Sequence, residues 1–325
     1  MSVILSVVVP TRDKLPLLQR TLRALAQQTL PAETWEVVVV DDASSDGTDR
    51  WLETAAGEWD GRLRIVSAGR NLGRAGARNA GGRAAAGRWI LFLDDDIIAP
   101  PALLDAHVAL LAGHPGCGVI GLVRTAASVV DGPHFHYIDS RGAAKVRGET
   151  VPARYLVTQN TSIPRADFVA VGGFDEGFAA YGFEDMDLGF RLEDVRGLRF
   201  LPLRDPVPEH IHHHALGAWL DKKRECGHGP LQHLAAQHPV RLAEMRLDLV
   251  LDVPGGPRAP APLRWARAAA RSPLSRVLEA VARRWPTAGG HTPRLSPLYA
   301  RLLDGLVLAA YCQGLAEHDR NPTRD

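Results

Sequence analysis

The sequence predicts an α/β fold in which a mostly parallel sheet is flanked by helices and followed by a helical C-terminal extension. Three observations lead to this prediction: strand-like and helix-like segments alternate through residues 2–96, the strand-like segments are mainly apolar, and the later part of the chain carries helical stripes. Alternation of this kind is typical of parallel sheets covered on both faces. With 325 residues, of which 46% are hydrophobic, the chain can bury a sizeable core in one large domain or two.

The predicted elements follow one another in order. Four predominantly apolar segments predict buried strands: 2–10, 35–42, 63–69 and 88–96. The first strand is followed by a helical stripe of leucines, which consists of Leu15, Leu18, Leu22 and Leu25. Residues 47–58 and 74–86 predict two further helices, the second of them rich in small residues. This βαβα order implies an open parallel sheet with helices on both faces.

Composition narrows the classes of function. The chain has 38 Lys and Arg residues against 37 Asp and Glu residues, and this net charge of +1 predicts no nucleic-acid partner. Its three cysteines lie far apart and form no disulfide framework or zinc motif, which suits a reducing cytosol. The N-terminal apolar run is interpreted as a strand rather than a leader, and no apolar stretch approaches the roughly 20 residues of a membrane span. We therefore expect a cytoplasmic location.

Polar residues follow three of the predicted strands. They are Thr11–Arg12, Asp41–Asp42 and Asp94–Asp96. Because ligands of such sheets bind beyond the carboxyl ends of the strands, we expect these residues along one rim. A rigid aspartate cluster is unfavourable unless a cation neutralises it, and carboxylates without thiolates favour Mg²⁺ or Mn²⁺, which keep open positions for phosphates. The alternative for the triplet is a solvated acidic turn that precedes the next helix.

A Gly- and Arg-rich segment, GRNLGRAGARNAGG, occupies residues 69–82. It is neither a P-loop nor the G-x-G-x-x-G motif of dinucleotide-binding folds. A helix that opens near Arg74 would aim its backbone N–H groups, and Arg74 or Arg78, at an anion. Its Gly and Ala residues are expected to pack closely on the sheet, whereas Asn71, Arg78 and Asn79 are expected to bind a phosphate-containing ligand.

Taken together, these motifs resemble a known family. VVVPTRD, VVVVDDASSDGT, NLGRAGARNAG and FLDDD resemble the successive motifs of family 2 glycosyltransferases with the GT-A fold. NTSIPRADFVAVGGFDEGFAAYGFEDMDLGFRL resembles the acceptor region of galactosyltransferase-like and polysaccharide-synthase-like members. The resemblance implies a catalytic domain over residues 1–214, with a nucleotide-sugar half at about 1–98 and an acceptor half at about 99–214. Residues 215–325 form the helical C-terminal region.

The resemblance implies roles for the donor-side residues. Asp41 would accept a hydrogen bond from the ring N–H of a uridine-type base, and Pro10, Thr11 and Arg12 would flank the same nucleoside. The D-x-D pattern of the family falls on the triplet of the fourth strand. There Asp96 would ligate the metal, Asp94 would reach the ribose or metal-bound water, and Asp95 would hold the variable middle position of the donor site.

The resemblance also implies the acceptor-side roles. Asp185 would be the general base and Glu184 would hold an acceptor hydroxyl, although a plain pair of charges at a helix N-terminus fits equally well on local grounds. His210 fits best as a further metal ligand and His212 second. Two more residues are expected on the acceptor side: Asn160 and Tyr181.

These predictions together describe an inverting, metal-dependent glycosyltransferase that uses Mn²⁺ or Mg²⁺ and a UDP-sugar donor, with a glycan, lipid-linked or small-molecule acceptor. The alternatives are a sugar nucleotidyltransferase and a non-catalytic sugar-binding protein. Residues 262–285 are rich in arginine and carry an apolar stripe of Leu274, Val277, Leu278, Val281 and Trp285. Such a helix can lie on an anionic membrane, which would place the protein at the inner face of the membrane, but packing on the catalytic domain is the favoured interpretation.

Overall fold

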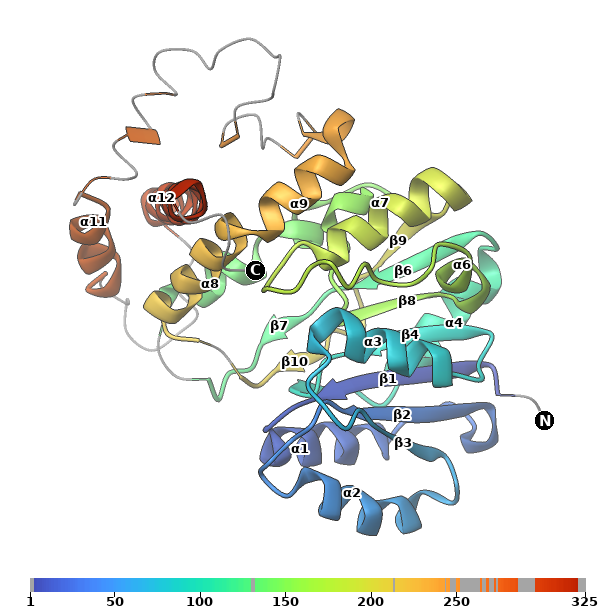
Figure 1. Ribbon diagram of the computed structural model, residues 1–325. Coiled ribbons are helices and arrows are strands. Elements are labelled where there is room, and N and C mark those ends of the chain that lie inside the picture. The colour runs from blue at the N-terminus through green and yellow to red at the C-terminus, as the bar shows by residue number, and fades with distance from the viewer. Residues whose placement is uncertain are drawn as a thin grey trace. The chain divides into compact units, whose positions relative to one another are not determined.

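The computed structural model describes residues 3–129, 132–212, 214–242, 244–245, 250–251, 264, 267–268, 272, 274–285 and 296–320. The chain divides into two compact units. The first unit comprises Met1–Val129, Arg141–Glu176 and Glu184–His212. The second comprises Val130–Ser140, Gly177–Phe183 and His213–Asp325, so two short segments from the expected catalytic domain belong to it. Figure 1 shows the elements of both.

The first unit is built on a seven-stranded sheet among the described residues, with the order β3-β2-β1-β4-β8-β6-β9. These strands are β1 (Leu5–Thr11), β2 (Trp35–Asp41), β3 (Leu63–Ser67), β4 (Trp89–Leu93), β6 (Cys117–Gly121), β8 (Asn160–Pro164) and β9 (Arg199–Leu203). The pairs β1–β2, β1–β4, β2–β3 and β6–β9 are parallel, and β8 runs antiparallel to β4 and β6. The predicted fold class and the four predicted strands are therefore confirmed.

Helices cover both faces of this sheet (Figure 1). The helices of the first unit are α1 (Leu15–Leu25), α2 (Thr48–Ala56), α3 (Gly73–Ala84), α4 (Leu103–Gly113), α6 (Arg165–Ala170) and α7 (Glu184–Arg196). Three leucines of the predicted stripe, Leu18, Leu22 and Leu25, pack with Val7 and Val9 of β1 in one buried core, and Leu15 is half-buried. On α3, a Cβ added at Gly81 would lie 2.3 Å from Val8 Cγ1, so the small residue lets this helix approach the sheet closely.

A small second sheet brings distant segments together. It has the order β5-β10-β7, made of β5 (Ile97–Ile98), β10 (Glu209–His210) and β7 (Arg124–Thr125). His210 lies opposite Ile97 in the antiparallel pair, and the Ile211 N–H donates to the Asp96 carbonyl at 3.0 Å. Backbone pairing therefore carries His210 to the end of the acidic triplet.

The second unit is helical where it is described. Its helices are α5 (Pro133–Asp139), α8 (Leu216–His228), α9 (Pro230–Gln237), α11 (Leu274–Arg283) and α12 (Pro297–Arg320). Short 3₁₀ turns complete the description of the chain: η1 (Ala32–Thr34), η2 (Gly57–Trp59), η3 (Gly142–Lys145), η4 (Ala153–Tyr155) and η5 (Pro239–Arg241). A Cβ at Gly314 of α12 would lie 2.0 Å from the Arg224 carbonyl oxygen of α8, so glycine permits close contact of these two helices. The predicted helical extension is confirmed.

Four of the large apolar side chains of α11 are exposed. Leu274, Val277, Leu278 and Val281 are 52%, 58%, 37% and 47% exposed, respectively. The buried positions of this helix are instead the small residues Ser275 and Ala282. The part of the predicted segment that falls on residues 262–263, 265–266, 269–271 and 273 lies outside the described residues. These four side chains are exposed on their own unit, and packing of this helix on the catalytic domain stays a prediction.

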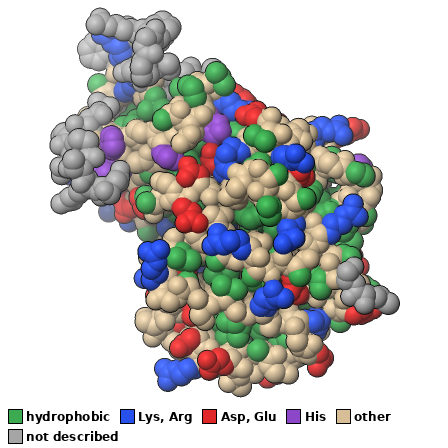
Figure 2. All heavy atoms as spheres, turned by 45° about the vertical axis from the view of Figure 1, so that its right-hand side comes forward, with side chains coloured by type: hydrophobic (Ala, Val, Ile, Leu, Met, Phe, Trp, Pro, Cys, Tyr) green, Lys and Arg blue, Asp and Glu red, His purple; other side chains and the backbone are tan. Residues whose placement is uncertain are grey.

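The surface carries charges of both signs. On the face drawn in Figure 2, Lys and Arg side chains are interspersed with Asp and Glu side chains, in keeping with the net charge of +1. Across the described part of the chain, no helix is both long enough and apolar enough to cross a membrane.

One buried histidine ties α4 to the sheet. His107 is fully buried, with Nδ1 2.7 Å from the Ser162 hydroxyl and Nε2 2.9 Å from Asn160 Oδ1, both on β8. A neutral ring satisfies both contacts, because Nε2–H donates to the amide oxygen and Nδ1 accepts from the hydroxyl. Burial lowers the pKa of His107 to about 4.

This geometry predicts acid sensitivity. The pKa of His107 is lower in the folded state than the ordinary value of 6.5, so the unfolded chain binds the proton more tightly. Stability is therefore lost as the pH falls below 6.5, by about 2 kcal/mol at pH 5, and the loss levels off below about pH 4. Urea unfolding at pH 7 and pH 5 measures it. His107→Gln, which keeps both hydrogen bonds and cannot titrate, should lose less stability than wild type between pH 7 and pH 5. An equal loss in both proteins would contradict the assignment of this acid sensitivity to His107.

Candidate functional site

The loops that follow β1 and β2 are joined at the carboxyl edge of the sheet. Asp13 Oδ1 accepts a hydrogen bond from the Ser45 N–H at 2.6 Å, and Asp46 Oδ2 accepts one from the Leu15 N–H at 2.9 Å. Asp13 has a φ of 51°, in the left-handed region that non-glycine residues rarely adopt. The hydrogen bonds between the loops hold this conformation. The rim expected from the sequence is therefore an ordered edge in which the loops are joined to one another.

The four residues expected around the nucleoside lie on this edge. Asp41 is 5% exposed, and its Oδ1 accepts a hydrogen bond from the Ser44 N–H at 3.0 Å. Thr11 is buried and donates to Asp95 Oδ2 at 2.8 Å. Pro10 is half-buried, and the exposed Arg12 side chain lies 3.7 Å from Asp13.

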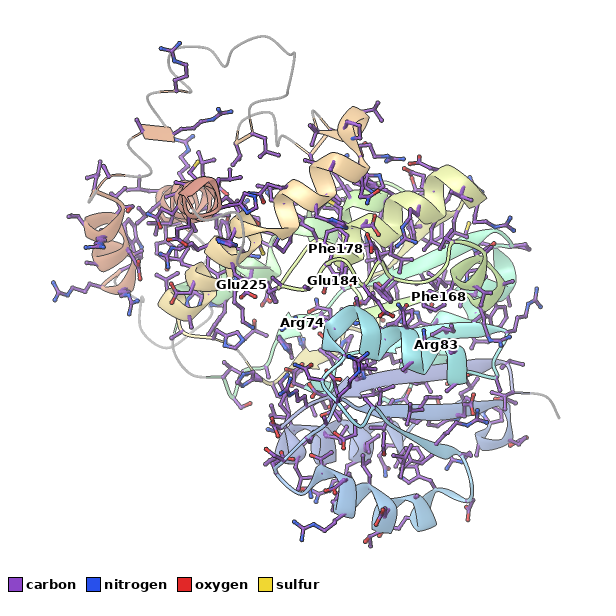
Figure 3. All side chains as sticks on the ribbon, in the orientation of Figure 1. Arg74, Arg83, Phe168, Phe178, Glu184 and Glu225 are labelled. Atoms are coloured by element: carbon purple, nitrogen blue, oxygen red, sulfur yellow. The ribbon has the colours of Figure 1, made fainter. Side chains whose placement is uncertain are left out.

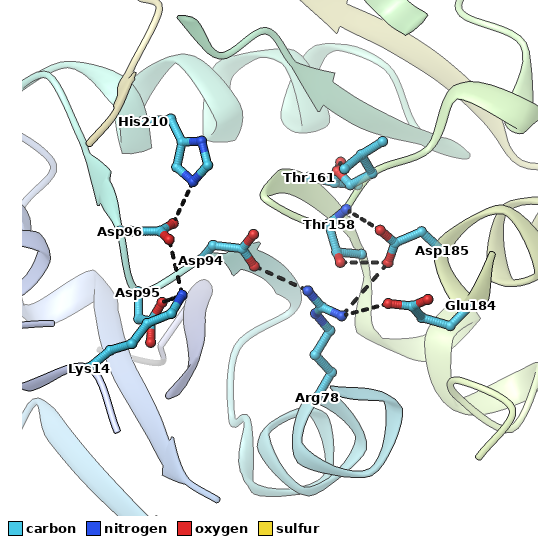
Figure 4. A network of polar contacts seen from close by, with 11 residues as sticks. Lys14, Arg78, Asp94, Asp95, Asp96, Thr158, Thr161, Glu184, Asp185 and His210 are labelled. Carbon is cyan, nitrogen blue, oxygen red and sulfur yellow. Dashed lines mark hydrogen bonds and ion pairs between the residues drawn. The ribbon is translucent and has the colours of Figure 1, made fainter. Parts of the chain in front are cut away.

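The three carboxylates of the acidic triplet point to different partners (Figure 4). Asp94 Oδ1 accepts from Arg78 Nη2 at 3.1 Å. Asp95 contacts Thr11 and Lys14, and Asp96 lies between Lys14 and His210. The triplet is therefore neutralised by surrounding cations instead of forming a solvated turn.

Lys14 is a site residue that the sequence interpretation missed. Its Nζ donates to Asp95 Oδ1 at 2.9 Å and to Asp96 Oδ2 at 3.0 Å. Burial opposes its charge, but the two carboxylates raise the pKa of Lys14 above its ordinary value. Burial raises the pKa of Asp95 to about 6, against the lowering influence of Lys14. The sequence feature that could have identified Lys14 is its position three residues beyond the end of β1, on the same rim as the other site residues.

The residues proposed as metal ligands meet in part. Asp96 Oδ1 lies 2.9 Å from His210 Nε2, and within the part of the chain that the structure describes this buried oxygen accepts no hydrogen bond. Burial alone would raise the pKa of Asp96, but His210 and Lys14 lower it well below its usual range. His212 is half-buried near the end of the first unit. Among the residues that the structure describes, no group of three or more His, Cys, Asp or Glu side chains is arranged to hold a metal ion.

The Asp96–His210 pair nevertheless fits a divalent ion. Ligand atoms lie about 2.0–2.2 Å from ions such as Mg²⁺ or Zn²⁺, so two adjacent ligands of one ion lie roughly 3 Å apart. The observed O–N separation of 2.9 Å and the buried oxygen without a hydrogen bond match that arrangement. Two protein ligands would leave the rest of the coordination shell for water and phosphate oxygens.

Arg78 lies between the two halves of the first unit and does not point to an open anion site. Its Nη2 contacts Asp94, its Nη1 lies 3.3 Å from Glu184 Oε1, and Nη1 is 4.0 Å from Asp185 Oδ1. The side chain is only 6% exposed. The guanidinium of Arg78 is paired with carboxylates (Figure 4), and its expected role as a donor-binding residue stays a prediction.

The Glu184–Asp185 pair begins α7, as the sequence predicted. Asp185 Oδ1 accepts from the Thr158 hydroxyl at 2.6 Å, and Oδ2 accepts from the Thr158 N–H at 3.2 Å. Glu184 is 4% exposed, and its Oε2 is buried without a hydrogen-bond partner among the described residues. Burial and the Asp185 charge raise the pKa of Glu184. Glu184 is therefore less accessible than Asp185, whose side chain is 18% exposed, and its expected contact with an acceptor hydroxyl stays a prediction.

The three asparagines expected to bind ligands make hydrogen bonds within the protein. Asn79 is buried, donates to Phe174 O at 3.0 Å and accepts from the Phe174 N–H at 2.8 Å. Asn160 is fully buried, and its amide contacts His107 and the Leu122 carbonyl. Both amides are therefore buried and paired within the protein, and their expected ligand-binding roles stay predictions. Asn71 is exposed and its side chain accepts from the Gly73 N–H at 2.9 Å.

Tyr181 belongs to the second unit. Its N–H donates to Glu225 Oε1 at 3.0 Å, and Lys222 Nζ lies 4.8 Å from the centre of its ring. Cys226 Sγ donates to the Tyr181 carbonyl. The ring thus forms a cation–π contact within that unit.

Comparison with known sequences gives a family. Residues 6–185 match the model of glycosyl transferase family 2. Validoxylamine A glucosyltransferase of Streptomyces hygroscopicus subsp. jinggangensis is 35% identical over 219 residues, which cover 58% of this chain and 51% of that protein. The uncharacterized glycosyltransferase YfnE of Bacillus subtilis is 28% identical over 257 residues, which cover 64% of each chain. This chain thus spans about half to two thirds of these relatives' length.

Comparison with solved structures agrees on the fold. The mannosyltransferase PcManGT from Pyrobaculum calidifontis, solved with GDP-Man and Mn²⁺, superposes with a TM-score of 0.62 at 20% identity and covers 100% of this chain and 89% of that one. S. aureus TarS 1–349, solved with UDP, gives a TM-score of 0.55 at 17% identity over 98% and 92% of the two chains. Both are glycosyltransferase-type folds of the GT-A class, which is the fold of this chain.

The contacts of Arg78 predict a large effect of its removal. Arg78→Met leaves three carboxylates without their shared cation, and breaking a buried pair in this way costs about 3–5 kcal/mol of the free energy of unfolding. Urea unfolding measures it, with Arg83→Met as the control, because Arg83 is exposed on the same helix (Figure 3). Adding Glu184→Gln to Arg78→Met should recover part of the loss. Equal stability of the two arginine variants would contradict the assignment.

Proposed function

The chain belongs to glycosyl transferase family 2, and on that premise we propose that it transfers a sugar from a nucleotide-sugar donor to an acceptor hydroxyl, with inversion at the sugar carbon. The observation that carries the proposal is the connection of Asp185 to the acidic triplet through Arg78, which holds a candidate base beside a candidate diphosphate site. The proposal does not specify which sugar is transferred, or whether the acceptor is a glycan, a lipid-linked molecule or a small molecule.

The donor binds along the strand-end edge in this proposal. Asp41 accepts from the base, Pro10, Thr11 and Arg12 flank the nucleoside, and Asp94 faces the ribose or metal-bound water. A uridine base is proposed from the resemblance of the DDASSDGT motif. The structural neighbours named above were solved with UDP in one case and with GDP-Man in the other, so both nucleotides belong in the test.

Asp96 and His210 would hold a divalent ion in this proposal, with His212 as the second histidine candidate. When bound, the ion neutralises charge that develops on the departing diphosphate. Lys14 and Arg78 neutralise the neighbouring carboxylates, so the protein does not present a bare acidic cluster to the diphosphate.

Asp185 takes the acceptor proton in the proposed reaction. Thr158 fixes the orientation of its carboxylate through two hydrogen bonds. The acceptor oxygen forms a bond to the sugar carbon while the bond from that carbon to the diphosphate oxygen breaks. The hydroxyl proton passes to Asp185, and the nucleoside diphosphate leaves with the bonding electron pair. Glu184 supports this arrangement through Arg78 and not by touching the acceptor.

A donor panel tests the function. UDP- and GDP-sugars are incubated with the chain, and we expect hydrolysis or transfer with Mn²⁺ or Mg²⁺ that EDTA abolishes and added metal restores. Asp185→Asn should leave the donor dissociation constant within a few-fold and lower kcat by roughly 10²–10⁴, which is the range for a lost general base. Asp194→Asn, on the same helix and exposed, is the matched control.

The outcomes separate the alternatives. Activity that survives in Asp185→Asn while KM for the donor rises would make Asp185 a binding residue. Donor binding without any turnover would favour a sugar-binding protein, and release of pyrophosphate from a nucleoside triphosphate would favour a sugar nucleotidyltransferase. Full activity in EDTA would remove the metal from the proposal.

We also propose peripheral contact with an anionic membrane through α11. Its four large apolar side chains are exposed, Arg276 and Arg283 are exposed on the same helix, and the exposed Arg284 directly follows it. Burial of the apolar side chains in the membrane and attraction of the arginines to anionic lipid then both favour binding. Each basic residue near the lipid contributes about 1 kcal/mol to the binding free energy.

Co-sedimentation with phosphatidylglycerol vesicles tests this contact. Binding should be strong at low salt and weak at high salt, and Val277→Asp with Val281→Asp should abolish it. Val195→Asp, at an equally exposed but isolated valine of α7, should have no effect. Absence of binding to anionic vesicles at low salt would contradict the proposal.

A further inference from the structure

The Lys14 ammonium lies where two acidic side chains converge. Its Nζ is 2.9 Å from Asp95 Oδ1 and 3.0 Å from Asp96 Oδ2. Both carboxylates have 5% exposed side chains, whereas the Lys14 side chain is 37% exposed. The two carboxylates are therefore fixed inside the protein. The lysine side chain is partly exposed to solvent, so its ammonium group can move away from them.

The choice of lysine at this position is chemically specific. The chain has 38 basic residues, of which only four are lysines: Lys14, Lys145, Lys222 and Lys223. An ammonium group is a compact point charge on a flexible stem, whereas a guanidinium is a planar fork that pairs rigidly with carboxylates. A compact charge fits between oxygens of two different side chains and can leave them without breaking a bidentate pair.

The same carboxylate that Lys14 contacts is the one that faces His210. Lys14 contacts Asp96 Oδ2, and His210 Nε2 lies beside Asp96 Oδ1. A divalent ion held by Asp96 and His210 would share this carboxylate with a positive ammonium. The divalent ion and the Lys14 ammonium would repel one another across this carboxylate. The repulsion is strong because the carboxylates of the site are largely buried.

We propose that Lys14 is a built-in counter-cation of the metal site. It neutralises Asp95 and Asp96 while no divalent ion is bound, and it weakens binding of that ion until a nucleoside diphosphate supplies further negative charge. Metal and nucleotide then bind cooperatively, and each tightens the binding of the other by the same factor. This inference rests on the proposed function, because it takes Asp96 and His210 as the metal ligands.

Calorimetric titration of Mn²⁺ into the metal-free full chain at pH 7.5 tests the inference without any turnover. Lys14→Met should bind Mn²⁺ alone roughly tenfold or more tightly than wild type, because the competing charge is removed. In wild type, UDP or GDP should tighten Mn²⁺ binding, and this enhancement should be smaller in Lys14→Met. Lys145→Met, at a surface lysine of the same unit, is the control and should match wild type.

Thermal unfolding provides a second measurement. Metal-free Lys14→Met should unfold at a lower temperature than wild type, because two buried carboxylates lose their shared cation, and Mn²⁺ should raise its unfolding temperature more than that of wild type. Lys14→Gln, which keeps hydrogen-bond donors without the charge, should follow Lys14→Met in Mn²⁺ affinity if the charge is the cause.

The outcomes distinguish this inference from the proposed function. If wild type binds Mn²⁺ with nucleotide, and Lys14→Met binds Mn²⁺ alone no more tightly than wild type, the role of Lys14 is overturned while the metal site stands. If Asp96→Asn leaves Mn²⁺ binding unchanged, or if neither wild type nor Lys14→Met binds Mn²⁺ with or without nucleotide, both the metal site and the counter-cation are overturned.

Discussion

A single buried guanidinium is the constraint on which the geometry of the site depends. Arg78 joins Asp94, at the end of β4, to Glu184 and Asp185, at the start of α7. Without it, these carboxylates would face one another across a poorly solvated space, where like charges repel strongly. The arginine therefore allows a candidate base and a donor-side aspartate, both only partly exposed, to lie close together.

Small residues on α3 make that arrangement possible. A Cβ at Gly81 would lie 2.3 Å from Val8 Cγ1, and one at Gly82 would lie 2.3 Å from Phe168 Cε1. The helix can approach the sheet on one side and α6 on the other only because these positions lack side chains. This close packing brings Arg78 to the ends of the strands. The electrostatics of the site therefore depend on the glycines of α3.

The sequence predicted the fold better than it predicted individual contacts. Continuous apolar strands have few alternatives to a covered parallel sheet, so the strands up to β4 and their polar ends were confirmed. The roles of Asn160 and Lys14 depend on partners 53 and 81–82 residues away, such as His107 and the acidic triplet. Local pattern does not reveal such partners, and a polar residue in a strand can be a buried structural amide as readily as a ligand.

The two cations of the site differ in a way that fits two different tasks. Arg78 is 6% exposed and meets three carboxylates with a planar fork, a geometry suited to permanent pairing. Lys14 is 37% exposed and meets two carboxylates as a point charge on a flexible stem, a geometry suited to exchange with another cation. Fixed neutralisation on the side of Asp185 preserves the orientation of the base, whereas replaceable neutralisation on the side of Asp96 lets the charge of the donor site change when the donor binds.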